Sequence, residues 1–157
     1  ALGGALVLLL TLLVGDQSYN GAGDGLIRAA LAGNVRPEAF LLKMLFTALT
    51  LGAGFRGGEI VPVLSVGCTF GAAVSPLLSM PASFAGALAM AATFCGATNC
   101  PMTAILLAYE LFGGQSLPLY ALCIGVAYML SGYYGLYSEQ HIIYSKFRTE
   151  RVDASAK

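Results

Sequence analysis

The chain has 157 residues, of which 57% are hydrophobic and only 10% are charged, whereas about 25% of the residues of a soluble domain carry charge. No charged residue and no histidine lies between Glu59 and Glu110, or between Glu110 and Glu139, which excludes a soluble globular fold. The formal net charge is zero, so nothing favours a nucleic-acid partner. The composition predicts an all-α protein embedded in a lipid bilayer.

Apolar segments follow one another along the chain and are separated by Gly, Pro and Asn. The expected helices cover residues 1–14, 21–31, 37–49, 60–78, 79–96, 101–112 and 118–132. Pro37 and Pro101 suit the first turn of a helix, and Asn99 is expected to cap the helix that begins at Pro101. The first segment opens without a starting Met or a basic region, so we interpret it as a helix cut at its start.

Several of these segments are shorter than the roughly 20 residues that a bilayer crossing needs. Half-spanning helices are tolerated at membrane depth only where their ends are buried in protein or line a cavity, and such ends commonly face a transported ion. The pattern therefore predicts a transport site. Residues 136–148 mix Tyr, Ile and charge, which is typical of an element at the membrane interface.

Basic residues gather at the end of the chain, at Lys146, Arg148, Arg151 and Lys157. Because basic flanks of membrane segments stay on the cytoplasmic side, we expect a cytoplasmic C-terminus in a multi-pass protein of the cell membrane. The organisation expected is a transmembrane region at 1–148 and a cytoplasmic tail at 149–157.

Other polar or reactive side chains receive structural interpretations. The four cysteines lie in apolar segments without a C-x-x-C pair, so we expect buried thiols and neither a disulfide nor a metal site. Glu110, at the end of a helix, is interpreted as structural. His141 is expected to be solvated or interfacial and not a proton relay. No cofactor is expected.

Three segments carry motifs in a fixed order. They are Gly54–Pro62, Gly96–Phe112 and Gly135–Ser138. The first resembles the second anion-site motif of the CLC family of chloride channels and anion/proton antiporters, written G-x-F-x-P. The second resembles a later CLC block that starts with an A/N-x-P pattern and ends in Glu, and the third resembles the segment that supplies a central tyrosine.

The resemblance implies a fold of two inverted halves with short, tilted and half-spanning helices, of which this chain is the C-terminal half. It implies transport of a small inorganic anion, chloride first and fluoride as the alternative, by a channel or by an antiporter that also moves protons. The N-terminal half of the same chain would be missing here. It also implies a homodimer, through helices that match residues 1–14, 101–112 and 117–130.

The family's anion site, carried over residue by residue, falls on Gly58, Glu59, Ile60, Val61, Pro62 and Tyr137. Backbone N–H groups, chiefly of Glu59 and Ile60, would face the anion, and Tyr137 would offer its hydroxyl. The physics agrees, because the first N–H groups of a helix lack intrahelical partners and carry about half a positive charge. Weak binding at several points is what rapid permeation requires.

The first motif departs from the family pattern at two positions. Ile60 stands where Phe is usual, and Glu59 brings a carboxylate beside the anion. An ionised carboxylate aimed at an anion would repel it, so we expect the Glu59 side chain to turn toward Arg56 or Gly57. The Gly-Gly-Glu variant resembles a bacterial branch of the family that includes fluoride/proton antiporters.

Alternatives of other classes stay open. Gly21–Asp24 matches the G-x-G-D pattern of intramembrane aspartyl proteases, which need a second carboxylate, and the other aspartates are Asp16 and Asp153. A structural membrane subunit is a third possibility. For single motifs, residues 57–62 could be an ordinary loop that starts a helix, and Tyr137 could be an interfacial anchor.

Overall fold

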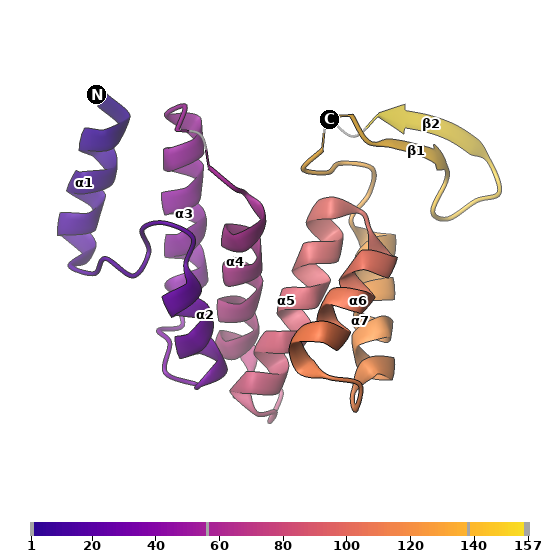
Figure 1. Ribbon diagram of the computed structural model, residues 1–157, viewed down its shortest axis with the longest axis horizontal. Helices are drawn as coiled ribbons and strands as arrows, with labels where there is room; N and C mark the ends of the chain where they lie inside the picture. The colour runs from indigo at the N-terminus through magenta and orange to yellow at the C-terminus, as the bar shows by residue number, and fades with distance from the viewer. Residues whose placement is uncertain (1, 56, 138, 156–157) are drawn as a thin grey trace. The chain divides into compact units, whose positions relative to one another are not determined.

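The computed structural model describes residues 2–55, 57–137 and 139–155, which form seven helices and a two-stranded sheet (Figure 1). The helices are α1 (Leu2–Val14), α2 (Asp24–Leu31), α3 (Ala39–Gly52), α4 (Ile60–Val74), α5 (Ala82–Thr98), α6 (Pro101–Phe112) and α7 (Leu117–Leu130). The strands are β1 (His141–Tyr144) and β2 (Arg151–Ser155). The expectation of a largely helical chain built from short helices is confirmed.

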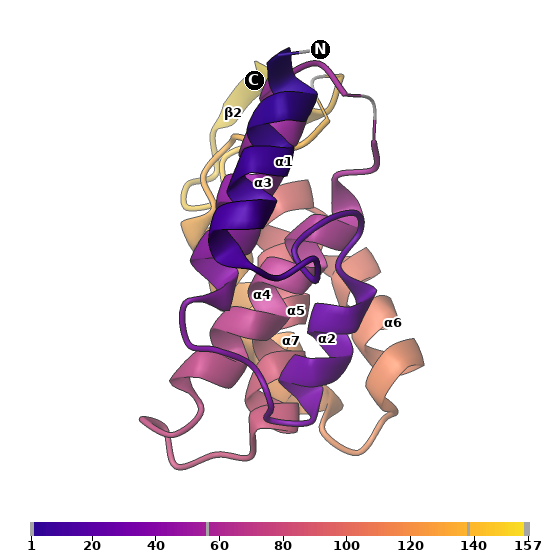
Figure 2. The ribbon, with the colours of Figure 1, turned by 90° about the vertical axis from the view of Figure 1, so that its left-hand side faces the viewer.

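The chain divides into two compact units, a first unit of residues 1–90 and a second unit of residues 91–157. In the first unit α4 packs against both α2 and α3, and α1 packs against α3, as Figure 2 shows for α1. A buried cluster of Tyr19, Leu26, Ala39 and Phe46 forms the core beside these helices. The rings of Tyr19 and Phe46 stack with centroids 5.7 Å apart, which holds the loop after α1 against α3.

Gly71 lets α4 approach the first half of α5 within the first unit. A Cβ atom at this position would overlap the carbonyl oxygen of Ala85 and would lie 2.7 Å from the Cβ of Ala89. Small residues permit such close backbone packing, which matters most where helices have no hydrophobic drive to associate. The Gly- and Ala-rich sequence of both helices is therefore a packing requirement.

The second unit contains the end of α5, the antiparallel pair α6 and α7, and the terminal sheet. Helices α6 and α7 pack on each other, and Phe112 stacks on Tyr120 with ring centroids 5.8 Å apart. Pro101 and Pro118 lie in the first turns of α6 and α7, as expected, where their missing N–H groups cost little.

Several helix boundaries and caps differ from the expectation, and three of the differences involve a proline or an asparagine. Helix α3 begins at Ala39, so Pro37 lies in the preceding turn and not in the helix. Helix α4 ends at Val74 and not at residue 78, since a turn that contains Pro76 follows it. Asn99 does not cap α6, whose N-cap position is Cys100. The Asn99 side chain instead donates to the Tyr134 carbonyl at 2.6 Å.

The interfacial element expected at 136–148 is in fact the start of an antiparallel hairpin. Strand β1 pairs with β2, with Ile142 opposite Ala154. Part of the expected tail at 149–157 is thus a β-strand, so the chain is not helical throughout. His141 is exposed and lies 3.8 Å from the Asp153 carboxylate. Ser138 and Lys157, which entered the motif and charge arguments, lie outside the described residues.

The longest helix among the described residues is α5, with 17 residues. None of the described helices has both the length and the apolar character that a membrane crossing requires.

Candidate anion site

The segment that carries the first motif forms the start of α4. Ile60 is the first helical residue and Glu59 occupies the N-cap position. The carbonyl of Glu59 accepts the first helical bond, from the N–H of Val63 at 3.1 Å. The N–H groups of Ile60 and Val61 therefore have no intrahelical partner, and Pro62 has no N–H to satisfy.

Local sequence explains why a helix starts at this point. Helix α3 ends at Gly52, and Gly54 two residues later adopts a φ of +82°, a conformation that favours glycine. The N–H of Gly54 then bonds to the Leu51 carbonyl at 2.9 Å, and the N–H of Phe55 bonds to the Thr50 carbonyl at 3.3 Å. Gly57 and Gly58 follow and are exposed, and neither has a side chain that could cover the N-terminus of α4.

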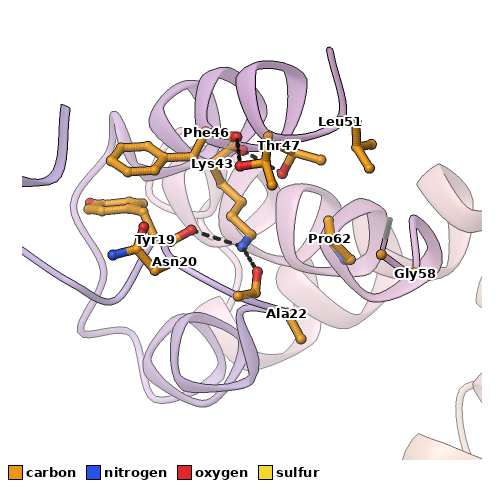
Figure 3. A pocket seen from close by; sticks show the side chains of 12 residues that line it. Tyr19, Asn20, Ala22, Lys43, Phe46, Thr47, Leu51, Gly58 and Pro62 are labelled. Carbon is orange, nitrogen blue, oxygen red and sulfur yellow. Dashed lines mark hydrogen bonds between the residues drawn. The ribbon is translucent and has the colours of Figure 1, made fainter. Parts of the chain in front are cut away.

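A pocket of about 240 Å³ opens beside this helix start, within the first unit (Figure 3). One wall comes from the loop after α1, a second from α3, and a third from the beginning of α4. The lining residues are Tyr19, Asn20, Gly21, Ala22, Lys43, Phe46, Thr47, Thr50, Leu51, Gly57, Gly58 and Pro62. None of these lining residues is acidic, and Lys43 is the one that carries a charge.

Lys43 is a buried side chain that sequence reasoning missed. It lies on α3 and is 1% exposed. Its ammonium group donates to the carbonyls of Tyr19 at 3.0 Å and Gly21 at 2.6 Å, and Figure 3 shows the side chain reaching from α3 toward the loop. A lone lysine within the apolar run of residues 39–52 was the signal that could have identified it, because buried charges are rare and are usually paired.

The loop that holds Lys43 contains the G-x-G-D sequence, and its glycines have a structural role. Gly23 has a φ of +96°, and a Cβ there would lie 2.6 Å from Ser65 Oγ and 2.9 Å from Lys43 Cε. Ser65 Oγ in turn donates to the Gly23 carbonyl at 3.2 Å. Packing around the lysine thus accounts for the glycine that the protease motif shares.

The carboxylate of Glu59 is exposed and makes no capping hydrogen bond at the start of α4. Arg56, one of its two expected partners, lies outside the described residues. The backbone of Glu59 lies at the N-cap position of α4, at the open end of the helix. The structure therefore brings Gly58, Glu59, Ile60, Val61 and Pro62 together at one helix N-terminus.

Tyr137 belongs to the second unit and is exposed, in the segment between α7 and β1. Its carbonyl accepts from the N–H of Gln140 at 3.0 Å, and the N–H of the preceding Leu136 bonds to the Ala97 carbonyl at 2.9 Å. These bonds fix the tyrosine segment to the end of α5.

A second lysine organises the end of α7 in the second unit. Lys146 Nζ donates to the Tyr128 carbonyl and to Ser131 Oγ, each at 2.8 Å, and to Asn99 Oδ1. It also lies 4.2 Å from the centroid of the Tyr128 ring. A cation is favoured at a helix C-terminus, and burial lowers the pKa of Lys146 below its ordinary value.

The cysteines are free in the structure. Cys68 and Cys95 are buried, as expected, whereas Cys100 and Cys123 are half-buried. Among the described residues, no group of His, Cys, Asp and Glu side chains is arranged to hold a metal ion.

Comparison with known proteins places the chain in a family. The family described as voltage gated chloride channel matches residues 1–132. A chloride/fluoride channel protein of Pseudomonas syringae pv. tomato is 35% identical over 150 residues, which cover 92% of this chain and 33% of the relative. The H(+)/Cl(-) exchange transporter ClcA of Vibrio parahaemolyticus is 31% identical over 147 residues, which cover 83% of this chain and 31% of the relative.

A solved structure gives the same result. The crystal structure of a CLC-type fluoride/proton antiporter matches with a TM-score of 0.83 and 34% identity, over 87% of this chain and 35% of the antiporter chain. The chain thus spans about a third of the length of the relatives it matches. The family match and the shared fold lead to one conclusion: this chain belongs to the voltage-gated chloride channel (CLC) family.

Proposed function

We propose that the full-length protein transports small inorganic anions across the cell membrane as a CLC-type channel or anion/proton antiporter. The observation that carries the proposal is the open N-terminus of α4. There the N–H groups of Ile60 and Val61 lack intrahelical partners beside a pocket with no acidic lining residue. The protein would act without enzyme chemistry and without a cofactor.

The physical basis is the partial positive charge of a helix N-terminus. Exposed N–H groups and the helix dipole favour an anion, and they bind it without the strong attraction of a full charge in contact. An anion held by several weak donors can also leave, which conduction and exchange both require. Gly57 and Gly58 support this function because they leave the backbone accessible.

We further propose that this chain supplies the second of two inverted halves, and that Tyr137 donates its hydroxyl to the anion held at Gly58–Pro62. The order of the three motifs supports this assignment, since the tyrosine segment follows the helix-start segment as in the family. The cluster of Lys146, Arg148 and Arg151 supports a cytoplasmic C-terminus.

Fluoride is the second candidate substrate. The Gly-Gly-Glu sequence at residues 57–59 replaces the family's usual motif, and two of the relatives are named for fluoride. These two are 34% and 35% identical to this chain, whereas the chloride exchanger of Vibrio is 31% identical. The observation favours a test of both halides and not of chloride alone.

Reconstitution of the full-length protein in liposomes tests the proposal. We expect efflux of chloride, of fluoride or of both, measured with ion-selective electrodes on vesicles loaded with each salt. Coupled uptake of protons against a gradient would identify an antiporter, and flux without proton movement would identify a channel. Protein-containing vesicles that retain both halides as well as empty vesicles do would overturn the proposal, and cleavage of added peptides would favour the protease.

The role of Tyr137 has its own test. Its hydroxyl is a neutral donor, so Tyr137→Ala should weaken anion binding by roughly five- to tenfold, which corresponds to about 1 kcal/mol, while the protein stays folded. Calorimetric titration of the full-length protein with chloride and with fluoride measures the effect. Unchanged affinity for both halides would exclude Tyr137 from the site.

We also propose a homodimer that forms through α1, α6 and α7. These helices expose large apolar side chains, among them Leu12, Leu106 and Leu122. Because lipid is as apolar as these faces, close packing would have to hold the subunits together. Cysteines introduced at these three positions should form inter-subunit crosslinks in native membranes. Crosslinks that form only between cysteines placed on α4 would contradict this interface.

A further inference from the structure

Lys43 and the pocket beside it are not used by the backbone site at the start of α4. The side chain is 1% exposed, and its ammonium group has three hydrogens to donate. Two of them go to the carbonyls of Tyr19 and Gly21. Among the described residues, no third acceptor bonds to this nitrogen, and the side chain lines the pocket shown in Figure 3.

The charge of Lys43 is not matched by a carboxylate. Asp24, in the first turn of α2, interacts with it electrostatically, but the described residues include no carboxylate within ion-pair distance of its ammonium group. Carbonyl oxygens satisfy hydrogen bonds without neutralising a charge. A buried charge without a counter-ion is costly, and an anion taken up from solution would supply that counter-ion.

The pocket offers space for that anion. Its volume of about 240 Å³ compares with about 30 Å³ for a water molecule in the liquid, so a small anion fits together with several waters. The hydroxyls of Thr47 and Thr50 donate to carbonyls of α3 at 2.8 and 2.7 Å. Among the pocket-lining residues of α3, Lys43 is therefore the one that keeps an unused donor hydrogen.

The same pocket reaches the proposed backbone site. Gly57, Gly58 and Pro62 form the wall that α4 contributes, next to the N–H groups of Ile60 and Val61. An anion in the pocket is thus attracted by the charge of Lys43 and by the helix N-terminus. Glu59, the acidic residue at the helix start, is exposed and is not part of the lining.

We propose that Lys43 supplies the fixed positive charge of an anion-binding pocket, and that a small hydrated inorganic anion binds there beside the start of α4. This inference rests on the proposed function and adds a named residue and a second anion position to it. Lys43 acts at a distance from the backbone donors, so its removal changes the concentration of anion needed and not the chemistry of the helix start.

The experiment measures halide flux and halide binding in the full-length protein in parallel. A unit charge about 10 Å from an anion, at an effective dielectric near 20, changes affinity by roughly tenfold. We therefore expect Lys43→Gln to raise the half-saturating halide concentration by about tenfold, and Lys43→Arg to raise it much less. Lys146→Gln, which removes a lysine bonded to carbonyls outside the pocket, should leave the half-saturating concentration unchanged.

A second pair of variants keeps Lys43 in place and covers the case in which Lys43→Gln does not fold. Thr47 lines the pocket one helical turn after Lys43. Thr47→Asp adds a negative charge there, and Thr47→Asn has nearly the same shape without the charge. We expect the half-saturating halide concentration of Thr47→Asp to exceed that of Thr47→Asn by about tenfold.

Binding measured by calorimetry distinguishes the two possible failures. If wild-type protein binds halide, Lys43→Gln binds it much more weakly and neither carries flux, the pocket is supported and the proposed transport is wrong. If wild-type protein carries halide, and Thr47→Asp matches Thr47→Asn in both flux and binding, the inference about Lys43 is overturned while the proposed function stands.

Discussion

Each unit of the molecule contains a lysine whose ammonium group is held by oxygen atoms of other residues. Lys43 in the first unit is buried and Lys146 in the second unit is half-buried, and the two differ in how many of their three donor hydrogens are used. Lys146 uses three donors on Asn99, Tyr128 and Ser131, and closes the C-terminal end of α7. Lys43 uses two donors and faces a pocket. The same residue type thus acts as a helix cap in one unit and as a candidate anion attractor in the other.

The difference follows from where each lysine lies. Lys146 comes from the segment between the strands and reaches an existing helix end, where carbonyls have no intrahelical partners. Lys43 lies in the first turns of α3, whose own carbonyls are used within the helix. Its acceptors come from the loop after α1, which Gly23 allows to approach closely. If the two lysines differ in this way, substitutions around Lys43 should destabilise the loop after α1, and substitutions around Lys146 should loosen the hairpin of β1 and β2.

The largest expected effect is that of Gly23→Ala. A φ of +96° costs a non-glycine residue about 1–2 kcal/mol, and the new Cβ would lie 2.6 Å from Ser65 Oγ, an overlap that adds a cost of similar size. We expect a loss of about 3 kcal/mol, measured as thermal stability of the purified full-length protein. Gly21→Ala is the control, because Gly21 also has a positive φ of 68° but has open space around its Cβ position. Equal losses for the two variants would contradict the close approach to Lys43.

Next in size is Lys146→Met in the second unit. It leaves the Tyr128 carbonyl, the Asn99 oxygen and the Ser131 hydroxyl without their cation, at an expected cost of about 2 kcal/mol. Hydrogen exchange of the amides of β1 should quicken, because the hairpin loses its attachment to α7. The exposed Arg148 provides the control, since Arg148→Met removes a neighbouring charge without such bonds. Protected β1 amides in Lys146→Met would show that the strand pairing alone holds the hairpin.

Ser65→Ala should have a smaller effect in the first unit. Ser65 is fully buried on α4 and its hydroxyl bridges to the Gly23 carbonyl at 3.2 Å, so its loss should cost about 1 kcal/mol. Ser75→Ala is a matched change just after α4, where the hydroxyl bonds to the nearby Ala72 carbonyl at 2.8 Å. Thermal stability should fall more for Ser65→Ala, and the reverse order would remove Ser65 from the support of the Lys43 loop.

Sequence alone predicted the features that depend on local pattern. The start of α4 follows from Gly57, Gly58 and Pro62, and the largely helical fold follows from apolar segments between Gly and Pro. Asn99 shows the limit of such reasoning. Its position before Pro101 is typical of a cap. Its side chain is instead hydrogen-bonded to Tyr134 and Ser131, which lie more than 30 residues away in the chain.

Two other features depend on contacts that no local pattern encodes. Lys43 could not be recognised as a pocket residue, because its acceptors lie 22 and 24 positions earlier in the chain. The hairpin was missed because β1 has only four residues and gains its partner across a turn, where the N–H of Ser145 bonds to the Glu150 carbonyl at 2.9 Å. The Lys43 contacts and the hairpin both form between segments that meet because the chain turns back on itself, and neither produces a periodic sequence pattern. The position of Tyr137 at the anion stays a prediction.

The smallest expected effect is that of Glu59→Gln, which tests the carboxylate closest in sequence to the helix start. Glu59 is exposed and makes no capping bond, so its charge contributes through the helix dipole, about 0.5 kcal/mol. Glu38→Gln is a close control, since Glu38 is likewise exposed at the N-cap position of α3 and makes no capping bond.

Because an exposed carboxylate that points away from the anion is screened by water, the halide affinity of Glu59→Gln should differ from that of the wild-type protein by less than about threefold. Halide binding and flux for both variants between about pH 5 and 8 measure this. A large gain in halide binding over wild-type protein that appears only in Glu59→Gln, and that changes with pH, would show that the Glu59 side chain senses the anion. In that case the first unit would place two opposite charges, those of Lys43 and Glu59, at one anion path.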